Sequence, residues 1–421
     1  MIFSLKSDFL STVMHLQHDL NNVTNWSKSV VRTFETHSFD DVPYYQSQLI
    51  DETVNFEIAR SMNLNLEDVR NLNYESQSPN LKIIKWLISN LSYVTPVQKL
   101  NLSFVLSSMG KYHLADNILK NVEFSKLLPK EQAYYYLQSF LLGNRLGTRN
   151  FFDEEFSKIK NILENNKLSP SAEMVFVTQV IAWYVKNKSF SVDIYKWFLD
   201  RGKLNEKKIK NSKDFHNLLA ASNYYRASAM VFMSFNNKED MRKTMELSYK
   251  TADLLEASSE LGFIKKTEAL KTYYESSSKE FAYYHKDLET SIKYLDSMEE
   301  IDSNWNITYQ EKGDIYSHFE HKEMAIQEYT KALNLDGPNY IYTLFKRSLL
   351  HEELRNYEKA LEGYKEIMLL DDLNLSSAIN GFNISIKLGK DEKEYFESII
   401  DEFIIKGLIN ESIKEEVIQH D

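Results

Sequence analysis

Cysteine is absent from the 421-residue chain, which excludes disulfides, cysteine nucleophiles and cysteine-ligated zinc or iron–sulfur sites. Glycine (11 residues) and proline (6 residues) are scarce. β-Sandwiches, barrels and doubly wound sheets need more of these turn residues, whereas long helices joined by short polar turns need few. Hydrophobic residues make up 43% of the chain, which is enough for a folded core. The composition therefore predicts an all-α protein.

A dominant basic surface is also missing, because the net charge is −11. Non-specific affinity for nucleic acid comes mainly from neutralising phosphates, so a basic partner segment suits this chain better. The N-terminal residues show no basic segment followed by an apolar run, and we expect no signal peptide. No apolar run is long enough to cross a bilayer. We therefore expect a cytoplasmic protein without a membrane partner.

Motifs for catalysis or cofactor binding are missing as well. The chain has no glycine-rich phosphate loop and no Gly-x-Ser-x-Gly nucleophile elbow. His351-Glu352-Glu353 begins like a zinc-protease motif, but Arg355 occupies the place of its second histidine. We expect no catalytic residue, no cofactor and no metal. Two histidine pairs have i, i+3 spacing without an indicated third ligand: His15 with His18, and His318 with His321.

A repeat of about 34 residues is visible in the C-terminal part of the chain. Small residues recur at Ser291, Ala325 and Ala360, which are 34 and 35 residues apart. An aromatic residue follows at i+4 in the segment of Ala325, as Tyr329. A small residue is needed where two helices cross closely, and a large aromatic residue fills the neighbouring groove. The spacing predicts helical hairpins, clearest over 272–370.

This pattern resembles the tetratricopeptide repeat (TPR) family. The likeness returns over 106–119, where Tyr112 and Ala115 match the turn and second helix of such a repeat. Tyr309 and Leu344 occupy the place of the family's tryptophan. The resemblance implies a TPR-like right-handed α-solenoid, in which the first helix of each repeat lines a concave face.

Three parts are expected along the chain. Residues 1–92 are predicted to form a helical N-terminal module, and 93–390 a TPR-like superhelix. The helices of 391–421 are expected to cap the array or to pair with a second copy. The sequence does not distinguish a monomer from a homodimer.

The middle of the chain is predicted to be helical, with longer spacings than a standard repeat. Ser169-Pro170 indicates a helix start, since proline suits the first helical position. The segment Lys203–Asp214, in which five of twelve residues are lysine, is predicted to be a charged loop. A helix over Phe215–Phe235 is expected to follow it.

The TPR resemblance implies which side chains line the concave face. That face is aromatic with acidic spots, and it lacks the lysine and asparagine clamp of TPRs that capture carboxylate tails. A peptide with apolar side chains and a basic residue would suit it. The candidate binding residues are Tyr273, Ser276, Glu280, Tyr283, Tyr284, Gln310, Asp314, His318, Tyr342, Phe345 and Glu352.

The helical N-terminal part and the degenerate repeats also resemble the Rap, Rgg, PlcR and arbitrium-receptor group of bacterial peptide receptors. In that group the superhelix holds a short peptide, and the N-terminal part contacts DNA or a response regulator. The resemblance implies a bacterial, cytoplasmic, peptide-responsive regulator. A DNA-reading helix-turn-helix would fit best over Glu57–Leu72. Nucleic acid is not favoured as a partner, because Glu67, Asp68 and a single Arg70 make a poor phosphate-contacting helix.

Two alternatives stay open. One is a TPR scaffold or adaptor that docks a partner enzyme or complex. The other, from a different class, is an enzyme with an unrecognised helical site. The sequence contains no motif that favours the enzyme, so we expect a non-enzymatic protein that binds a peptide or protein partner.

Overall fold

Every regular element in the described part of the chain is a helix, which confirms the all-α class. The computed structural model describes residues 65, 67–68, 71–73, 81–108, 111–146, 153–165, 168–187, 192–256, 260–335, 339–372 and 374–407. Most of the predicted N-terminal module, including His15, His18 and most of Glu57–Leu72, lies outside these residues. No described helix combines the length and apolar character that crossing a membrane requires.

The described residues divide into two compact units, and the first extends from Glu67 to Glu280. Within it, α6 packs on α7, α10 on α11 and α12 on α13, each as sequential neighbours. Ala115 on α7 is fully buried, as the TPR-like spacing predicts. The α-helices of this unit are α5 (Leu81–Ser89), α6 (Pro96–Ser108), α7 (Tyr112–Lys120), α8 (Pro129–Leu146), α9 (Asp153–Asn165), α10 (Pro170–Asn187), α11 (Val192–Ile209), α12 (Phe215–Ser234), α13 (Lys238–Asp253) and α14 (Glu260–Lys279).

The predicted charged loop over Lys203–Asp214 is wrong for most of its length, because α11 continues to Ile209. Asn205 and Ile209, four residues apart, are buried on one face of the helix, while the lysines between them are exposed. The lysine run is therefore the solvated face of an amphipathic helix. Asp214 then caps α12, since its carboxylate accepts the Asn217 backbone N–H at 2.9 Å.

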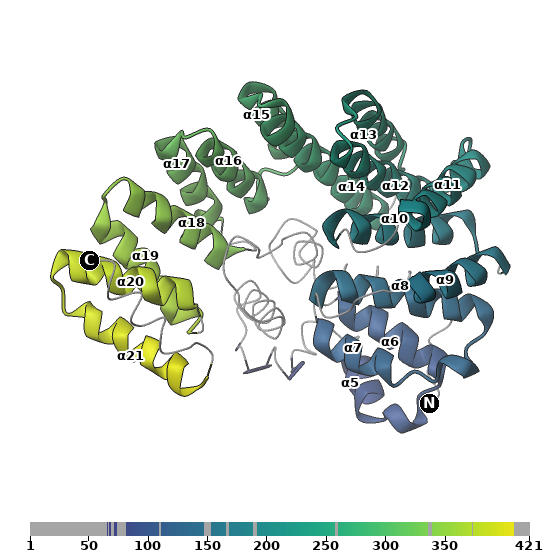
Figure 1. The fold of residues 1–421 in the computed structure, drawn as a ribbon, viewed down its shortest axis with the longest axis horizontal. Helices are drawn as coiled ribbons and strands as arrows, with labels where there is room; N and C mark the ends of the chain where they lie inside the picture. Colours follow the sequence, from purple (N-terminus) through teal and green to yellow (C-terminus); the bar gives the residue numbers. More distant parts are fainter. Residues whose placement is uncertain are drawn as a thin grey trace. The chain divides into compact units, whose positions relative to one another are not determined.

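The second unit begins at Phe281, inside a six-residue π-helix, η4 (Glu280–His285). Figure 1 shows its later helices following one another side by side, and α16 with α17, α18 with α19, and α20 with α21 form successive hairpins. The first two of these hairpins lie within 272–370, where the sequence predicts TPR-like repeats most clearly. Its α-helices are α15 (Leu288–Ile301), α16 (Asn306–His318), α17 (Lys322–Asn334), α18 (Tyr340–Glu353), α19 (Tyr357–Leu370), α20 (Leu375–Leu388) and α21 (Glu392–Ile405).

Small residues mark the places where the helices cross. Ser291, Ala325 and Ala360 have no exposed surface, which confirms the predicted spacing. Gly313 on α16 faces Tyr329 on α17 so closely that an added Cβ would lie 2.5 Å from the tyrosine ring. The tyrosine ring can pack directly against the α16 backbone here because glycine has no side chain.

We expect Gly313→Ala to lower the free energy of unfolding by about 1–3 kcal/mol, because the added methyl group meets the Tyr329 ring. This loss outweighs the gain of up to about 1 kcal/mol in helix propensity. Urea denaturation followed by far-UV circular dichroism measures the change. Gln327→Ala, at an exposed position of α17, should stay within about 0.5 kcal/mol of wild type. A Gly313→Ala protein as stable as wild type would show that the crossing can widen without cost.

Candidate functional site

In the first unit, two of the candidate binding residues are buried and hold Arg242. The Arg242 guanidinium donates to the Tyr273 hydroxyl at 2.8 Å and pairs with the Glu280 carboxylate at 3.1 Å. Tyr273 is 5% exposed and Glu280 is 4% exposed. Ser276, on the same helix as Tyr273, is half-buried. The structure thus uses Tyr273 and Glu280 to tie α14 and η4 to α13, and not as surface.

Two candidates in the second unit are buried too. Gln310 on α16 accepts a hydrogen bond from the Asn339 side-chain amide at 3.2 Å. Phe345 on α18 lies in the core beside Tyr364, with ring centroids 6.0 Å apart. Gln310 thus contacts the start of the next hairpin, whereas Phe345 packs inside its own hairpin of α18 and α19. The candidate binding residues of this unit that keep exposed surface are Tyr283, Tyr284, Asp314, His318, Tyr342 and Glu352.

An exposed aromatic and cationic group lies at the start of the unit. The Tyr283 and His318 rings meet edge to face, with centroids 4.8 Å apart. Lys286 Nζ lies 3.2 Å from His318 Nε2. Lys286 has a φ of 59°, which turns the chain out of the π-helix. Sequence reasoning missed Lys286, because nothing in its local pattern separates it from other surface lysines.

Asp314 on α16 is oriented by two tyrosine hydroxyls from different helices. Tyr329 on α17 donates at 2.6 Å, and Tyr342 on α18 donates at 3.2 Å. Burial, followed by the charge of Asp314, raises the pKa of Tyr329 well above its ordinary value. The hydroxyl therefore keeps its proton and stays a donor, so the half-buried carboxylate has a fixed direction.

A similar arrangement recurs one hairpin later around Glu352 on α18. Tyr364 on α19 donates its hydroxyl to the Glu352 carboxylate at 3.1 Å. Asn380 on α20 in turn donates to the Tyr364 hydroxyl at 3.2 Å. Burial and the charge of Glu352 raise the pKa of Tyr364, so this hydroxyl also stays protonated. In both places an acid on a first helix is held by a tyrosine on the second helix and linked to the next first helix.

The sequence did not reveal that Tyr329 and Tyr364 hold acidic side chains, because both tyrosines fit a core position of the repeat. A signal was present: a buried tyrosine must place its hydroxyl against a polar group. Phenylalanine would fill nearly the same volume and would need no polar partner. The tyrosines at these two positions therefore indicate a nearby acceptor on the first helix of each hairpin.

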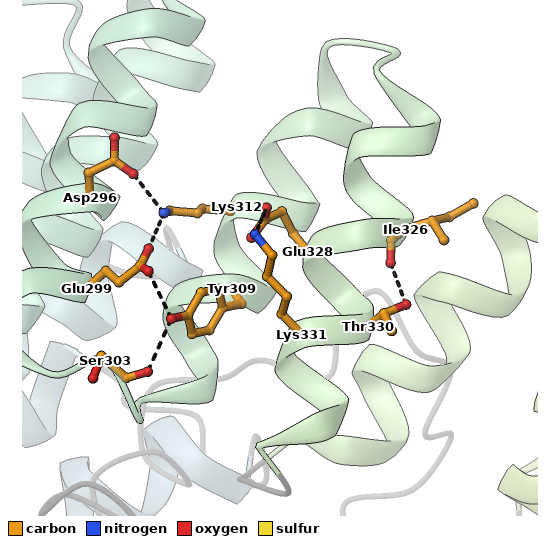
Figure 2. Close-up of polar contacts among 9 residues, drawn as sticks. All are labelled: Asp296, Glu299, Ser303, Tyr309, Lys312, Ile326, Glu328, Thr330 and Lys331. Carbon is orange, nitrogen blue, oxygen red and sulfur yellow. Dashed lines mark hydrogen bonds and ion pairs between the residues drawn. The ribbon is translucent and has the colours of Figure 1, made fainter.

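The buried Lys312 forms an ion-pair network with two more exposed acids between α15 and α16, which Figure 2 shows. Its Nζ lies 2.7 Å from an Asp296 oxygen and 2.5 Å from a Glu299 oxygen. The Tyr309 hydroxyl donates to Glu299 at 3.0 Å and to the Ser303 carbonyl at 3.2 Å. Burial alone would lower the pKa of Lys312, but the bonds to Asp296 and Glu299 outweigh it and raise the pKa. The network fixes α16 against the preceding helix.

Among the described residues, no three histidine, aspartate or glutamate side chains come together in a way that could hold a metal ion. His318 and His321 lie at opposite ends of the turn between α16 and α17. Their rings contact different tyrosines, Tyr283 and Tyr316 respectively.

The hairpins, with small residues at their crossings and one polar arrangement repeated along the second unit, define a TPR-like helical-repeat protein. No protein-family model and no curated protein matches the chain. Among solved structures it is similar to a signal transduction ATPase with numerous domains (STAND) protein with a tetratricopeptide repeat sensor from Pyrococcus horikoshii. That match has 16% identity and a TM-score of 0.43 over 97% of this chain and 66% of the other.

The chain is also similar to yeast Tom70, with 13% identity and a TM-score of 0.21 over 89% of this chain and 100% of the other. It spans less than two thirds of the length of the STAND protein. The TPR-like fold therefore rests on the hairpins themselves and on their helix crossings.

The Glu299 carboxylate should stabilise the fold in a pH-dependent way. Burial would raise the pKa of Glu299, but Lys312 and Tyr309 outweigh burial and lower it. A lowered folded-state pKa gives stability that is complete above the ordinary value of 4.5 and is lost as pH falls through the folded-state value. Glu299→Gln should therefore be less stable than wild type at neutral pH, by about 1 kcal/mol.

The two proteins should converge in free energy of unfolding as the pH falls below 4.5. Urea denaturation at a series of pH values measures this. Glu362→Gln, at an exposed position of α19, should lie within about 0.5 kcal/mol of wild type at neutral pH. A constant gap between wild type and Glu299→Gln across the acidic range would show that ionised Glu299 contributes no stability.

Proposed function

We propose that this chain is a non-enzymatic TPR-like protein that binds a peptide or protein segment through its second unit, and that it acts as a bacterial, cytoplasmic, peptide-responsive regulator. The observation that carries the proposal is the repeated placement of an oriented acid. Asp314 and Glu352 lie on the first helices of successive hairpins, each held by a tyrosine hydroxyl. Tyr283, His318 and Tyr342 supply partly exposed aromatic surface in the same unit.

A carboxylate that is already oriented loses little freedom when it receives a lysine or arginine side chain. Such charge-assisted hydrogen bonds are about twice as strong as neutral ones. Tyrosine rings add apolar contact area with a polar end. The net charge of −11 further favours approach of a basic segment. The expected ligand is a short segment with apolar side chains and at least one basic residue.

Labelled short peptides, with apolar residues flanking either arginine or glutamine, test the proposal by fluorescence anisotropy. We expect the arginine peptide to bind wild type, and the double variant Asp314→Asn, Glu352→Gln to bind it at least about ten-fold more weakly. The amide side chains can still accept the tyrosine hydrogen bonds, so the fold should persist. A shift in melting temperature with peptide gives an independent readout, because a ligand that binds only the folded state stabilises it.

Glu362→Gln removes one charge from an exposed position of α19 and is the matched control. It should change the affinity by less than about two-fold. Equal binding by wild type and the double variant would remove these two acids from the site. If no peptide binds but a folded partner co-purifies in a stable complex, the scaffold or adaptor role replaces the peptide-responsive one.

A further inference from the structure

The second unit carries a cation at the same place in two successive hairpins. Lys312 on α16 and Arg347 on α18 are 35 residues apart, which is the length of the repeat. Each side chain contacts the helix that precedes its own: Lys312 contacts α15, and Arg347 contacts Thr330 on α17. The two positions are structurally equivalent, so their surroundings can be compared residue by residue.

The carboxylates that hold Lys312 have no counterparts at Arg347. The offset of 34 residues that relates Ser291 to Ala325 brings Asp296 to Thr330 and Glu299 to Leu333. Figure 2 shows the two carboxylates that meet at Lys312, and it shows Thr330 on α17, whose hydroxyl donates to the Ile326 carbonyl at 2.7 Å. The cation position is retained, and both acidic partners are replaced by uncharged residues.

The positive charge of Arg347 therefore has few hydrogen-bonding or ion-pairing partners. Its guanidinium donates one long hydrogen bond, of 3.4 Å, to the Thr330 hydroxyl. Among the residues described in the structure, no carboxylate forms an ion pair with it. Glu366 acts on it from farther away, and that carboxylate accepts the Tyr340 hydroxyl at 2.6 Å. Burial lowers the pKa of Arg347, and Glu366 and Tyr340 offset this only in part, whereas the pKa of Lys312 is raised.

Two further nitrogen-bearing side chains belong to the same hairpin as Arg347, namely His351 on α18 and Lys359 on α19. His351 follows it by one turn of α18, and its buried Nδ1 has no hydrogen-bond partner among the described residues. Burial first, and then the charges of Arg347 and Lys359, lower the pKa of His351. Arg347 and Lys359 therefore both lie near enough to His351 for their charges to act on it. Lys359, on α19, is exposed, and Arg347 and His351 are partly exposed.

We propose that Arg347, with His351 and Lys359, binds a carboxylate that is supplied by an acidic segment of a partner protein. The bound carboxylate would complete at Arg347 the arrangement that Asp296 and Glu299 provide for Lys312. A guanidinium suits this ligand, because its planar fork donates two parallel hydrogen bonds to a carboxylate.

This site is separate from the proposed peptide-binding surface and does not depend on it. On α18, Tyr342 contacts α16 whereas Arg347, five residues later, contacts α17. Side chains five residues apart on a helix point about 140° apart. The two surfaces also prefer ligands of opposite charge, so failure of one leaves the other testable.

Labelled oligoglutamate and inorganic phosphate are the two probes, applied to the full chain at low salt. We expect oligoglutamate to bind wild type in fluorescence anisotropy, and Arg347→Gln to bind it at least about ten-fold more weakly. Lys393→Gln, which removes an equal charge from an exposed position of α21, should change the affinity by less than about two-fold. Unchanged binding by Arg347→Gln, or no binding by wild type, would overturn the proposal.

Thr330→Asp tests the comparison between the hairpins directly. It places a carboxylate where Asp296 stands against Lys312, so it should raise the melting temperature and abolish oligoglutamate binding. Thr330→Asn, of the same size without charge, should do neither. Oligoglutamate binding by Thr330→Asp at wild-type affinity would overturn the proposal. Binding of phosphate alone, lost in Arg347→Gln, would overturn the assignment to a protein carboxylate in favour of a phosphate site.

Discussion

The close approach of the two helices within each hairpin is the constraint on which the second unit depends. Gly313 leaves room for the Tyr329 ring, and Gly381 leaves room for the Phe396 ring. Because Tyr329 sits in that space, its hydroxyl reaches Asp314 on the neighbouring helix. The direction of this half-buried acid thus depends on a glycine in the core, because the glycine leaves room for the tyrosine that holds the acid.

The hairpins share some residues and differ in others. The crossings keep small residues, since a larger one would separate the helices. Between the hairpins, by contrast, Lys312 and Arg347 share a position but differ in partners. Arg347, which is partly exposed, carries a desolvation cost that Glu366 and Tyr340 offset only in part. Arg347 thus occupies the position of Lys312 without the two acids that hold Lys312, and this difference is the basis of the proposed carboxylate site.

The features of the fold that could be predicted from the sequence are those that every hairpin must share. The spacing of Ser291, Ala325 and Ala360 identified the crossings, because every hairpin must place a small residue there. The burial of the candidate binding residues could not be predicted in the same way. The TPR resemblance indicates which way a helix faces, but it does not indicate how much of that face the neighbouring helices cover. Gln310 and Phe345 were expected at a binding face, but Gln310 accepts a hydrogen bond from Asn339 and Phe345 packs beside Tyr364 of its own hairpin.

The two oriented acids connect more helices than a single hairpin contains. Asp314 joins α16, α17 and α18 through tyrosine hydroxyls, and Glu352 joins α18, α19 and α20 through Tyr364 and Asn380. α18 belongs to both sets. In repeat proteins, stability is approximately a sum of repeat and nearest-neighbour terms. A ligand that bound both acids would therefore stabilise the α16–α18 and the α18–α20 contacts together. Such binding would make the successive hairpins more rigid relative to one another.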